Sequence, residues 1–124
     1  MPQMFALGVD IVEIERIARA VERWGNQFLQ RIYTPQEVAY CRGRTDRLAA
    51  RFAAKEAVMK ALGTGVRGAG WREIEVVRQR GQPPTVLLHG RAHQRAQALG
   101  IESLSLSISH SRSYAIATVV GAKG

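Results

Sequence analysis

The sequence centres on one alanine-rich segment, residues 46–65, which reads DRLAARFAAKEAVMKALGTG. Alanine has the highest helix propensity, and no proline or glycine occurs before Gly63, so we expect a helix from about Asp46 to Leu62. Either Thr45 or Asp46 can cap its first turn, and the glycines after Leu62 are a typical C-terminal signal. The many small side chains let another element approach this helix closely.

Short apolar segments elsewhere in the chain predict β-strands. The clearest is residues 103–109, where Leu104, Leu106 and Ile108 alternate with serines, which is the period of a half-buried strand. A turn over residues 80–83, RGQP, favours a hairpin between two further strands. The expected strands are residues 5–12, 73–78, 85–88, 103–109 and 114–120.

Other segments predict helices. Apolar residues at helical spacing predict a helix over residues 14–29. Residues 34–37, TPQE, are typical of a helix start, because the threonine can cap, the proline fits the first helical position and the glutamate completes a capping box. A short helix is expected over residues 91–99. Since helices and hairpins are segregated along the chain, the sequence predicts an α+β fold in a single domain, residues 1–124.

Composition excludes several classes of protein. The chain has 124 residues, of which 46% are hydrophobic and 23% charged, as in ordinary folded proteins, and this excludes disorder. No apolar segment is long enough to cross a bilayer, and the first residues lack the basic region of a secretory signal. We therefore expect no membrane attachment. The lone Cys41 has no disulfide partner in the chain, which favours a reducing cytoplasm.

The charge of the chain points to an anionic partner. Eighteen basic residues against ten acidic ones give a net charge of +8, and 15 of the basic residues are arginines. The guanidinium group presents a planar fork that suits phosphates and carboxylates. The partner is therefore a nucleic acid, a phosphorylated small molecule or an acidic protein, and composition alone does not choose among these.

Two places carry charged residues where the pattern predicts apolar ones. Asp10 lies in the apolar segment 5–12; it can cap the helix that follows, or it can bind magnesium, because hard cations favour oxygen ligands on rigid supports. Glu56 and Lys60 are four residues apart and share one face of the long helix. They form either an ion pair in solvent or, because alanines surround them, part of a packed functional face.

A third candidate is His110, which continues the apolar face of the strand 103–109. Such a histidine is commonly a hydrogen-bonded residue of the core or its rim, and contact with a ligand is the alternative. The sequence contains no zinc signature, no GxGxxG and no Walker A loop. The glycine-rich residues 63–68 could approach a phosphate, but they follow a helix C-terminus that repels anions, so they would need Lys60 or an arginine beside them.

Together these segments resemble one family, the holo-acyl-carrier-protein synthases, which are the short group of the 4′-phosphopantetheinyl transferases. Their order, their spacing and the length of the chain all agree with that family. The resemblance implies an α+β, 4′-phosphopantetheinyl transferase-like fold with antiparallel strands and a long helix packed on them. The matching segments are residues 8–13, GVDIVE, with Arg16 and Ile17; residues 51–57, RFAAKEA, with residues 60–65, KALGTG; and residues 107–111, SISHS.

The resemblance also implies an activity used in fatty acid biosynthesis. The family transfers the 4′-phosphopantetheine arm of coenzyme A to a serine of apo acyl carrier protein and releases adenosine 3′,5′-bisphosphate. Asp10 and Glu56 would bind Mg²⁺, and Lys60 and His110 would contact coenzyme A. The residues that would line the nucleotide pocket are Ser109, Gly63, Thr64 and Gly65.

Protein partners follow from the same resemblance. Arg16 would bind the acidic recognition helix of the carrier protein, and Arg19 and Arg23 fit that face by their spacing alone. The family is typically homotrimeric, with each active site between two protomers. This chain departs from many members at the hairpin, where it has Gly81-Gln82-Pro83 in place of Gly-Lys-Pro. The departure puts a contact near that turn in doubt, but not the activity.

The chemistry explains why these residue types are needed. A serine hydroxyl attacks the β-phosphorus of a pyrophosphate, and such transfers depend on positioning and on neutralising charge. Two carboxylates from separate elements suit a magnesium ion that keeps waters and takes substrate oxygens, and Lys60 would add a positive charge beside the phosphates. Glu56, acting through a water on the metal, is the first candidate for the general base, and His110 is the second.

Two other functions account for part of the sequence. A small nucleic-acid-binding domain would explain the charge, but aromatic residues are only 6% of the chain, and Asp10 and Glu56 would have no role. A non-catalytic subunit that uses only the arginine-bearing first helix is the other alternative. The family resemblance favours the enzyme, with no nucleic acid among its partners.

Overall fold

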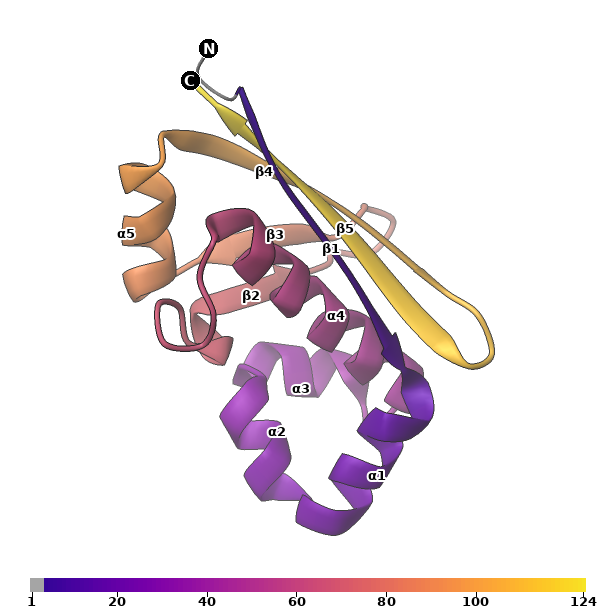
Figure 1. The fold of residues 1–124 in the computed structure, drawn as a ribbon. Coiled ribbons are helices and arrows are strands. Elements are labelled where there is room, and N and C mark those ends of the chain that lie inside the picture. The colour runs from indigo at the N-terminus through magenta and orange to yellow at the C-terminus, as the bar shows by residue number, and fades with distance from the viewer. Residues whose placement is uncertain (1–3) are drawn as a thin grey trace.

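The structure, a computed structural model, describes residues 4–124 (Figure 1). Helices α1 to α3 gather at one end of the molecule, and the long helix α4 runs from there across a sheet. In chain order the elements are β1 (Phe5–Glu13), α1 (Ile14–Trp24), α2 (Asn26–Ile32), α3 (Pro35–Cys41), α4 (Thr45–Leu62), the 3-10 turn η1 (Trp71–Glu73), β2 (Ile74–Val77), β3 (Thr85–Leu88), α5 (Gly90–Ala98), β4 (Ile101–His110) and β5 (Tyr114–Lys123).

The main sheet has three antiparallel strands in the order β1-β5-β4, and β2 and β3 form a separate antiparallel hairpin. Helix α4 packs on one face of the main sheet, along β1 and β5. The contact is so close that a side chain at Gly8 would collide with the carbonyl oxygen of Ala57 on α4. The alanine-rich sequence of α4 therefore has the packing role that its small side chains predicted, and the predicted α+β fold is confirmed.

The opposite face of β1, which we call the outer face, is apolar and exposed. Burial alternates along β1, so that Gly8, Asp10 and Val12 are buried against α4 while their neighbours point away. The four β1 residues on this face have relative solvent exposures between 53% and 68%. These residues are Phe5, Leu7, Val9 and Ile11, and Tyr114 and Ile116 of β5 are also exposed.

A buried ion pair joins three elements on the other side of α4. The ammonium group of Lys55, which is fully buried, donates to Glu37 Oε1 at 2.7 Å and to the carbonyl oxygens of Trp71 and Ile74. Glu37 Oε2 in turn accepts from the backbone of Val76 at 2.9 Å. Burial lowers the pKa of Lys55, and the Glu37 carboxylate opposes that shift. The pair ties α3 and β2 to α4.

Two of the predicted helix boundaries are wrong. The helix expected over residues 14–29 is interrupted at Gly25, whose φ of +55° is a left-handed conformation that favours glycine, so α1 ends and α2 begins there. Helix α4 is capped by neither Thr45 nor Asp46, because Arg44 occupies the N-cap position without a side-chain cap. The Asp46 carboxylate instead pairs with Arg44 at 3.0 Å.

The other predicted elements are confirmed, with small shifts at their ends. The capping box of residues 34–37 forms, and both of its hydrogen bonds are present at the start of α3. Strand β2 is shorter than expected, because η1 occupies the residues before it, and β4 and β5 are longer. No helix within residues 4–124 is long and apolar enough to span a membrane.

Candidate active site

Strand β1 and helix α4 bring three of the predicted site residues together. Asp10 is 9% exposed and faces α4, and Glu56 is half-buried on the facing side of that helix. One turn later, Lys60 Nζ donates to Asp10 Oδ1 at 3.1 Å and to the carbonyl oxygen of Val9 at 3.0 Å. The N-cap of α1 is Glu13, so the capping role considered for Asp10 is wrong. We call Asp10, Glu56 and Lys60 the carboxylate site.

The electrostatics of this site reflect how close its charges lie. Burial raises the pKa of Glu56, and the neighbouring Asp10 carboxylate raises it further. The positive charges of Arg16 and Lys60 oppose both effects. A cation bound between the two carboxylates would oppose this effect and favour the ionised form of Glu56.

The donor set fits magnesium. Asp10 and Glu56 offer hard carboxylate oxygens from a strand and a helix that pack against each other. Within residues 4–124 no group of three or more histidine, cysteine or acidic side chains could hold a metal ion. A cation at this site would therefore have two protein ligands and would fill its other positions with water or substrate oxygens, which is the coordination that Mg²⁺ favours.

The three arginines predicted on the first helix have different surroundings. The Arg16 guanidinium lies 5.9 Å from the centre of the Phe52 ring and acts on the pKa of Glu56, so it borders the carboxylate site. Arg19 pairs with an exposed glutamate one turn earlier, at 3.4 Å. Arg23 lies over the exposed ring of Trp24, 4.9 Å from its centre. Only Arg16 is therefore close to the carboxylates.

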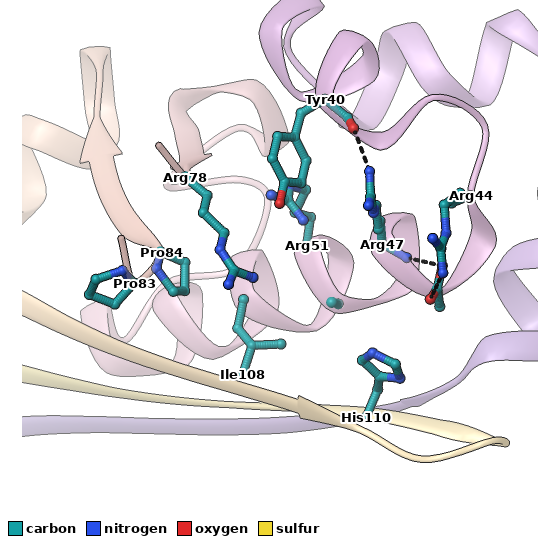
Figure 2. Close-up of a pocket in the computed structure, with 11 residues that line it drawn as sticks. Tyr40, Arg44, Arg47, Arg51, Arg78, Pro83, Pro84, Ile108 and His110 are labelled. Carbon is teal, nitrogen blue, oxygen red and sulfur yellow. Dashed lines mark hydrogen bonds and ion pairs between the residues drawn. The ribbon is translucent and has the colours of Figure 1, made fainter. Parts of the chain in front are cut away.

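A second concave region lies on the other side of α4 (Figure 2). It is a cavity of about 500 Å³ between α3, the first half of α4, the β2–β3 hairpin and the end of β4. Its sole acidic lining residue, Asp46, is paired with Arg44. We call this region the arginine pocket. Its basic residues are Arg44, Arg47, Arg51, Arg78 and His110.

One group in the arginine pocket lacks a partner. The guanidinium of Arg51 stacks 4.1 Å from the centre of the Tyr40 ring, and Arg51 is 5% exposed. Its Nε is buried and has no hydrogen-bond acceptor in the described part of the chain. A buried donor left unsatisfied is unfavourable, and an anionic group in the pocket would place negative charge beside this guanidinium.

The remaining predicted residues do not meet at one place. Successive helix residues are about 100° apart, which puts Arg47 and Glu56 about 180° apart around α4. His110 lies in the arginine pocket with Arg47, so the described chain does not bring it to Lys60. The alternation of β4 directs Ser109 to the outer face, next to Ile116.

The predicted loop residues 63–65 form a third group. Gly63 lines a hollow of about 380 Å³ together with Lys60, on the carboxylate side of α4. Gly63 adopts a φ of +69° and ends the helix, as the sequence indicated. The residues proposed for one nucleotide pocket are thus divided between the end of α4, the outer face and the arginine pocket.

The arginine pocket was not predicted from the sequence. A signal was present, because residues 44, 47 and 51 are spaced by three and four and so lie along one side of a helix. The hairpin that departs from the family at Gln82 also contributes, since Arg78 extends from it into the pocket. Arg78 Nε donates to the carbonyl oxygen of Gln82 at 3.3 Å, which ties this arginine to the turn.

Comparisons with known proteins identify the family of this chain. Residues 6–119 match the model of the 4′-phosphopantetheinyl transferase superfamily. The holo-[acyl-carrier-protein] synthase of Koribacter versatilis is 52% identical over 117 residues, which cover 91% of this chain and 94% of that protein.

Solved structures give the same result for the fold. The crystal structure of the Helicobacter pylori holo-[acyl-carrier-protein] synthase in complex with coenzyme A superposes with a TM-score of 0.85 and 35% identity, covering 94% of this chain and 99% of that one. The corresponding enzyme of Neisseria meningitidis gives a TM-score of 0.86 at 37% identity, with coverage of 95% and 98%. The chain therefore belongs to the 4′-phosphopantetheinyl transferase superfamily, alongside the holo-[acyl-carrier-protein] synthases.

Proposed function

We propose that this chain transfers 4′-phosphopantetheine from coenzyme A to a serine of apo acyl carrier protein. The products are holo acyl carrier protein and adenosine 3′,5′-bisphosphate. The observation that carries the proposal is the carboxylate site, where Asp10 and Glu56 face each other with Lys60 one turn away. The named activity of its relatives and the coenzyme A in the H. pylori structure support the same substrate pair.

The carboxylate site supplies what the reaction needs. The serine oxygen forms a bond to the β-phosphorus, and the bond from that phosphorus to the bridging oxygen breaks, so the leaving group is the 5′-phosphate of adenosine bisphosphate. Asp10 and Glu56 would hold Mg²⁺, which when bound neutralises charge on the diphosphate. Lys60 would add a positive charge beside the same oxygens, and Glu56, acting through a water on the metal, is our first candidate to accept the serine proton. His110, across α4, is less suited to that role within one chain.

The arginine pocket would bind the nucleotide phosphates. Its arginines and His110 face an anion with at least one free buried donor, Arg51 Nε. Because this pocket and the carboxylate site lie on opposite sides of α4, one coenzyme A molecule would reach both only if they came from different copies of the chain. We therefore propose that each active site combines the carboxylate site of one protomer with the arginine pocket of its neighbour.

The outer face offers the surface for that assembly. Four apolar side chains of β1 are more than half exposed there, and they alternate along the strand with Gly8, Asp10 and Val12. Contiguous apolar surface of this kind usually marks a protein interface. A homotrimer closed through this face would bury these residues and would bring Ser109 next to the neighbouring copy.

The carrier protein would approach along α1. Arg16, Arg19 and Arg23 are exposed and present positive charge to an acidic helix, which raises the rate of encounter more than the final affinity. Arg16, beside Glu56, would stand where the carrier serine enters. Cys41 is a buried free thiol, which fits function in a reducing cytoplasm.

Mass spectrometry of apo acyl carrier protein tests the proposal. Incubation with the protein, coenzyme A and Mg²⁺ should add the phosphopantetheine arm to the carrier, and a chelator should prevent it. A carrier protein that keeps its original mass would contradict the transferase assignment. A melting temperature raised by an oligonucleotide, but not by coenzyme A with Mg²⁺, would favour the nucleic-acid-binding alternative.

A further inference from the structure

Helix α5 holds the loop that follows α4 at two points. The loop, residues 63–70, begins where α4 ends. Arg95 Nε donates to the carbonyl oxygen of Leu62, the last residue of α4, at 2.9 Å. Arg91 Nη1 donates to the carbonyl oxygen of Arg67, in the middle of the loop, at 2.7 Å. The two arginines are four residues apart, so they extend from one side of α5.

Arg91 of α5 and Glu73 of η1 hold the far end of the loop. Arg91 Nε and Nη2 donate to Glu73 Oε1 at 3.1 and 3.0 Å. That same oxygen accepts from the backbone of Gly70 at 2.7 Å. The guanidinium of Arg91 is therefore fixed by a carboxylate and can act as a rigid support for Arg67.

Arg95 also lines the hollow beside the carboxylate site. The hollow is also lined by Gly63 and by two other cations, Lys60 and Lys123. A Cβ at Gly63 would lie 3.5 Å from Arg95 Nη2, so the guanidinium passes close to the left-handed residue that ends α4. Arg95 thus links α5 to the backbone just after Lys60.

We propose that Arg95, assisted by Arg91, is a positioning residue that holds the 63–67 backbone in the shape that admits coenzyme A. Glycine-rich backbone loses much conformational freedom when it becomes ordered, and this loop has glycines at 63, 65, 68 and 70. A loop that is already held in place needs less ordering when the substrate binds, and its affinity for the substrate rises accordingly. This inference rests on the proposed function, because it assumes that coenzyme A contacts this loop.

The substitution Arg95→Met keeps the aliphatic stem and removes the donor to Leu62. Loss of one such hydrogen bond corresponds to an increase of about three- to tenfold in the KM for coenzyme A. The kcat and the KM for the carrier protein should stay within about twofold, because the carboxylate site is untouched. Arg31→Met on α2 is the matched control, since Arg31 is exposed and belongs to a different helix. Arg95→Lys, which keeps a donor, should recover part of the lost affinity.

Hydrogen exchange of the free protein separates positioning from direct contact with the substrate. Without coenzyme A, the amides of residues 64–68 should exchange faster in Arg95→Met than in the wild type or in Arg31→Met. Unchanged exchange in this loop, or a KM for coenzyme A equal to that of Arg31→Met, would overturn the positioning role. A wild-type protein that transfers nothing to the carrier would instead contradict the proposed function. The exchange measurement would still show whether Arg95 holds the loop in place.

Discussion

The two sides of α4 carry opposite kinds of site. Toward β1, the helix presents Glu56 and Lys60 to Asp10, which makes a partly buried acidic pair with one lysine beside it. Toward β4, it presents arginines to a cavity that holds an unsatisfied buried donor. The carboxylate site suits a cation together with the phosphates that the cation would bind, and the arginine pocket suits an anion directly. Under the proposed function, each side by itself would be half of a site for a metal-assisted diphosphate reaction.

The largest expected effect on activity comes from substitutions in the carboxylate site. Glu56→Gln or Asp10→Asn removes a carboxylate while keeping the shape of the side chain, and kcat should fall by about 10²–10³-fold. The melting temperature should change little, because each substitution also removes the repulsion between the two carboxylates. Radiolabelled pantetheine transfer measures this, with the exposed Glu22→Gln as control. Normal turnover in either variant would remove that residue from the carboxylate site.

The second-largest effect is expected at the buried ion pair of Lys55 and Glu37, which ties α3 and β2 to α4. Lys55→Met leaves the Glu37 carboxylate buried without its partner, and breaking a fully buried pair in this way reduces the free energy of unfolding by about 3–5 kcal/mol. Denaturant unfolding followed by circular dichroism measures the loss. Replacing both partners, with Lys55→Met and Glu37→Leu, should recover part of it. If the single variant were as stable as the wild type, the pair would not be what holds α3 and β2 to α4.

A smaller effect is expected within the arginine pocket. The double substitution Arg47→Ala with His110→Ala should raise the KM for coenzyme A about tenfold and change kcat less, because it removes charge from nucleotide binding rather than from the reacting phosphorus. Dephospho-coenzyme A, which lacks the 3′-phosphate, should lose part of its disadvantage in this variant. A fall in kcat with an unchanged KM would place these residues at the chemistry instead.

The smallest expected effect distinguishes two arginines of α1. Arg23→Glu should raise the KM for the carrier protein a few-fold, about as expected for an exposed charge at the rim of an interface, and leave kcat unchanged. Arg16→Glu should raise the same KM and also lower kcat, because it puts a third carboxylate near Glu56. Both effects on the KM should weaken at high salt. Identical kinetics for the two variants would mean that Arg16 does not border the active site.

The sequence predicted the fold better than it predicted the assembly of the site. Helix α4 and the strand of alternating serines follow from local periodicity, and the capping box fixed the start of α3. The break at Gly25 was missed because apolar residues continue at helical spacing beyond it.

Long-range contacts account for what the site prediction missed. Helical spacing related Glu56 to Lys60, and the family resemblance added Asp10; in the structure a strand and an adjacent helix bring the three together. The arginine pocket needs walls from α3, the hairpin and β4, whose meeting depends on tertiary packing. The family resemblance groups His110 with Lys60; α4 separates them within one chain, and in the assembly that we propose they meet across two protomers.

Mixing two impaired variants, assayed at coenzyme A concentrations below the KM of the wild type, tests the central claim most directly. Glu56→Gln lacks an intact carboxylate site, and Arg47→Ala with His110→Ala lacks an intact arginine pocket. If every active site combines one side of α4 from each of two copies, co-expression in equal amounts should restore about a quarter of all sites, which is about one site in each mixed trimer. The account predicts transferase activity in the mixture well above the sum of the two variants measured separately. Activity no greater than that sum, in oligomers shown to contain both chains, would contradict it.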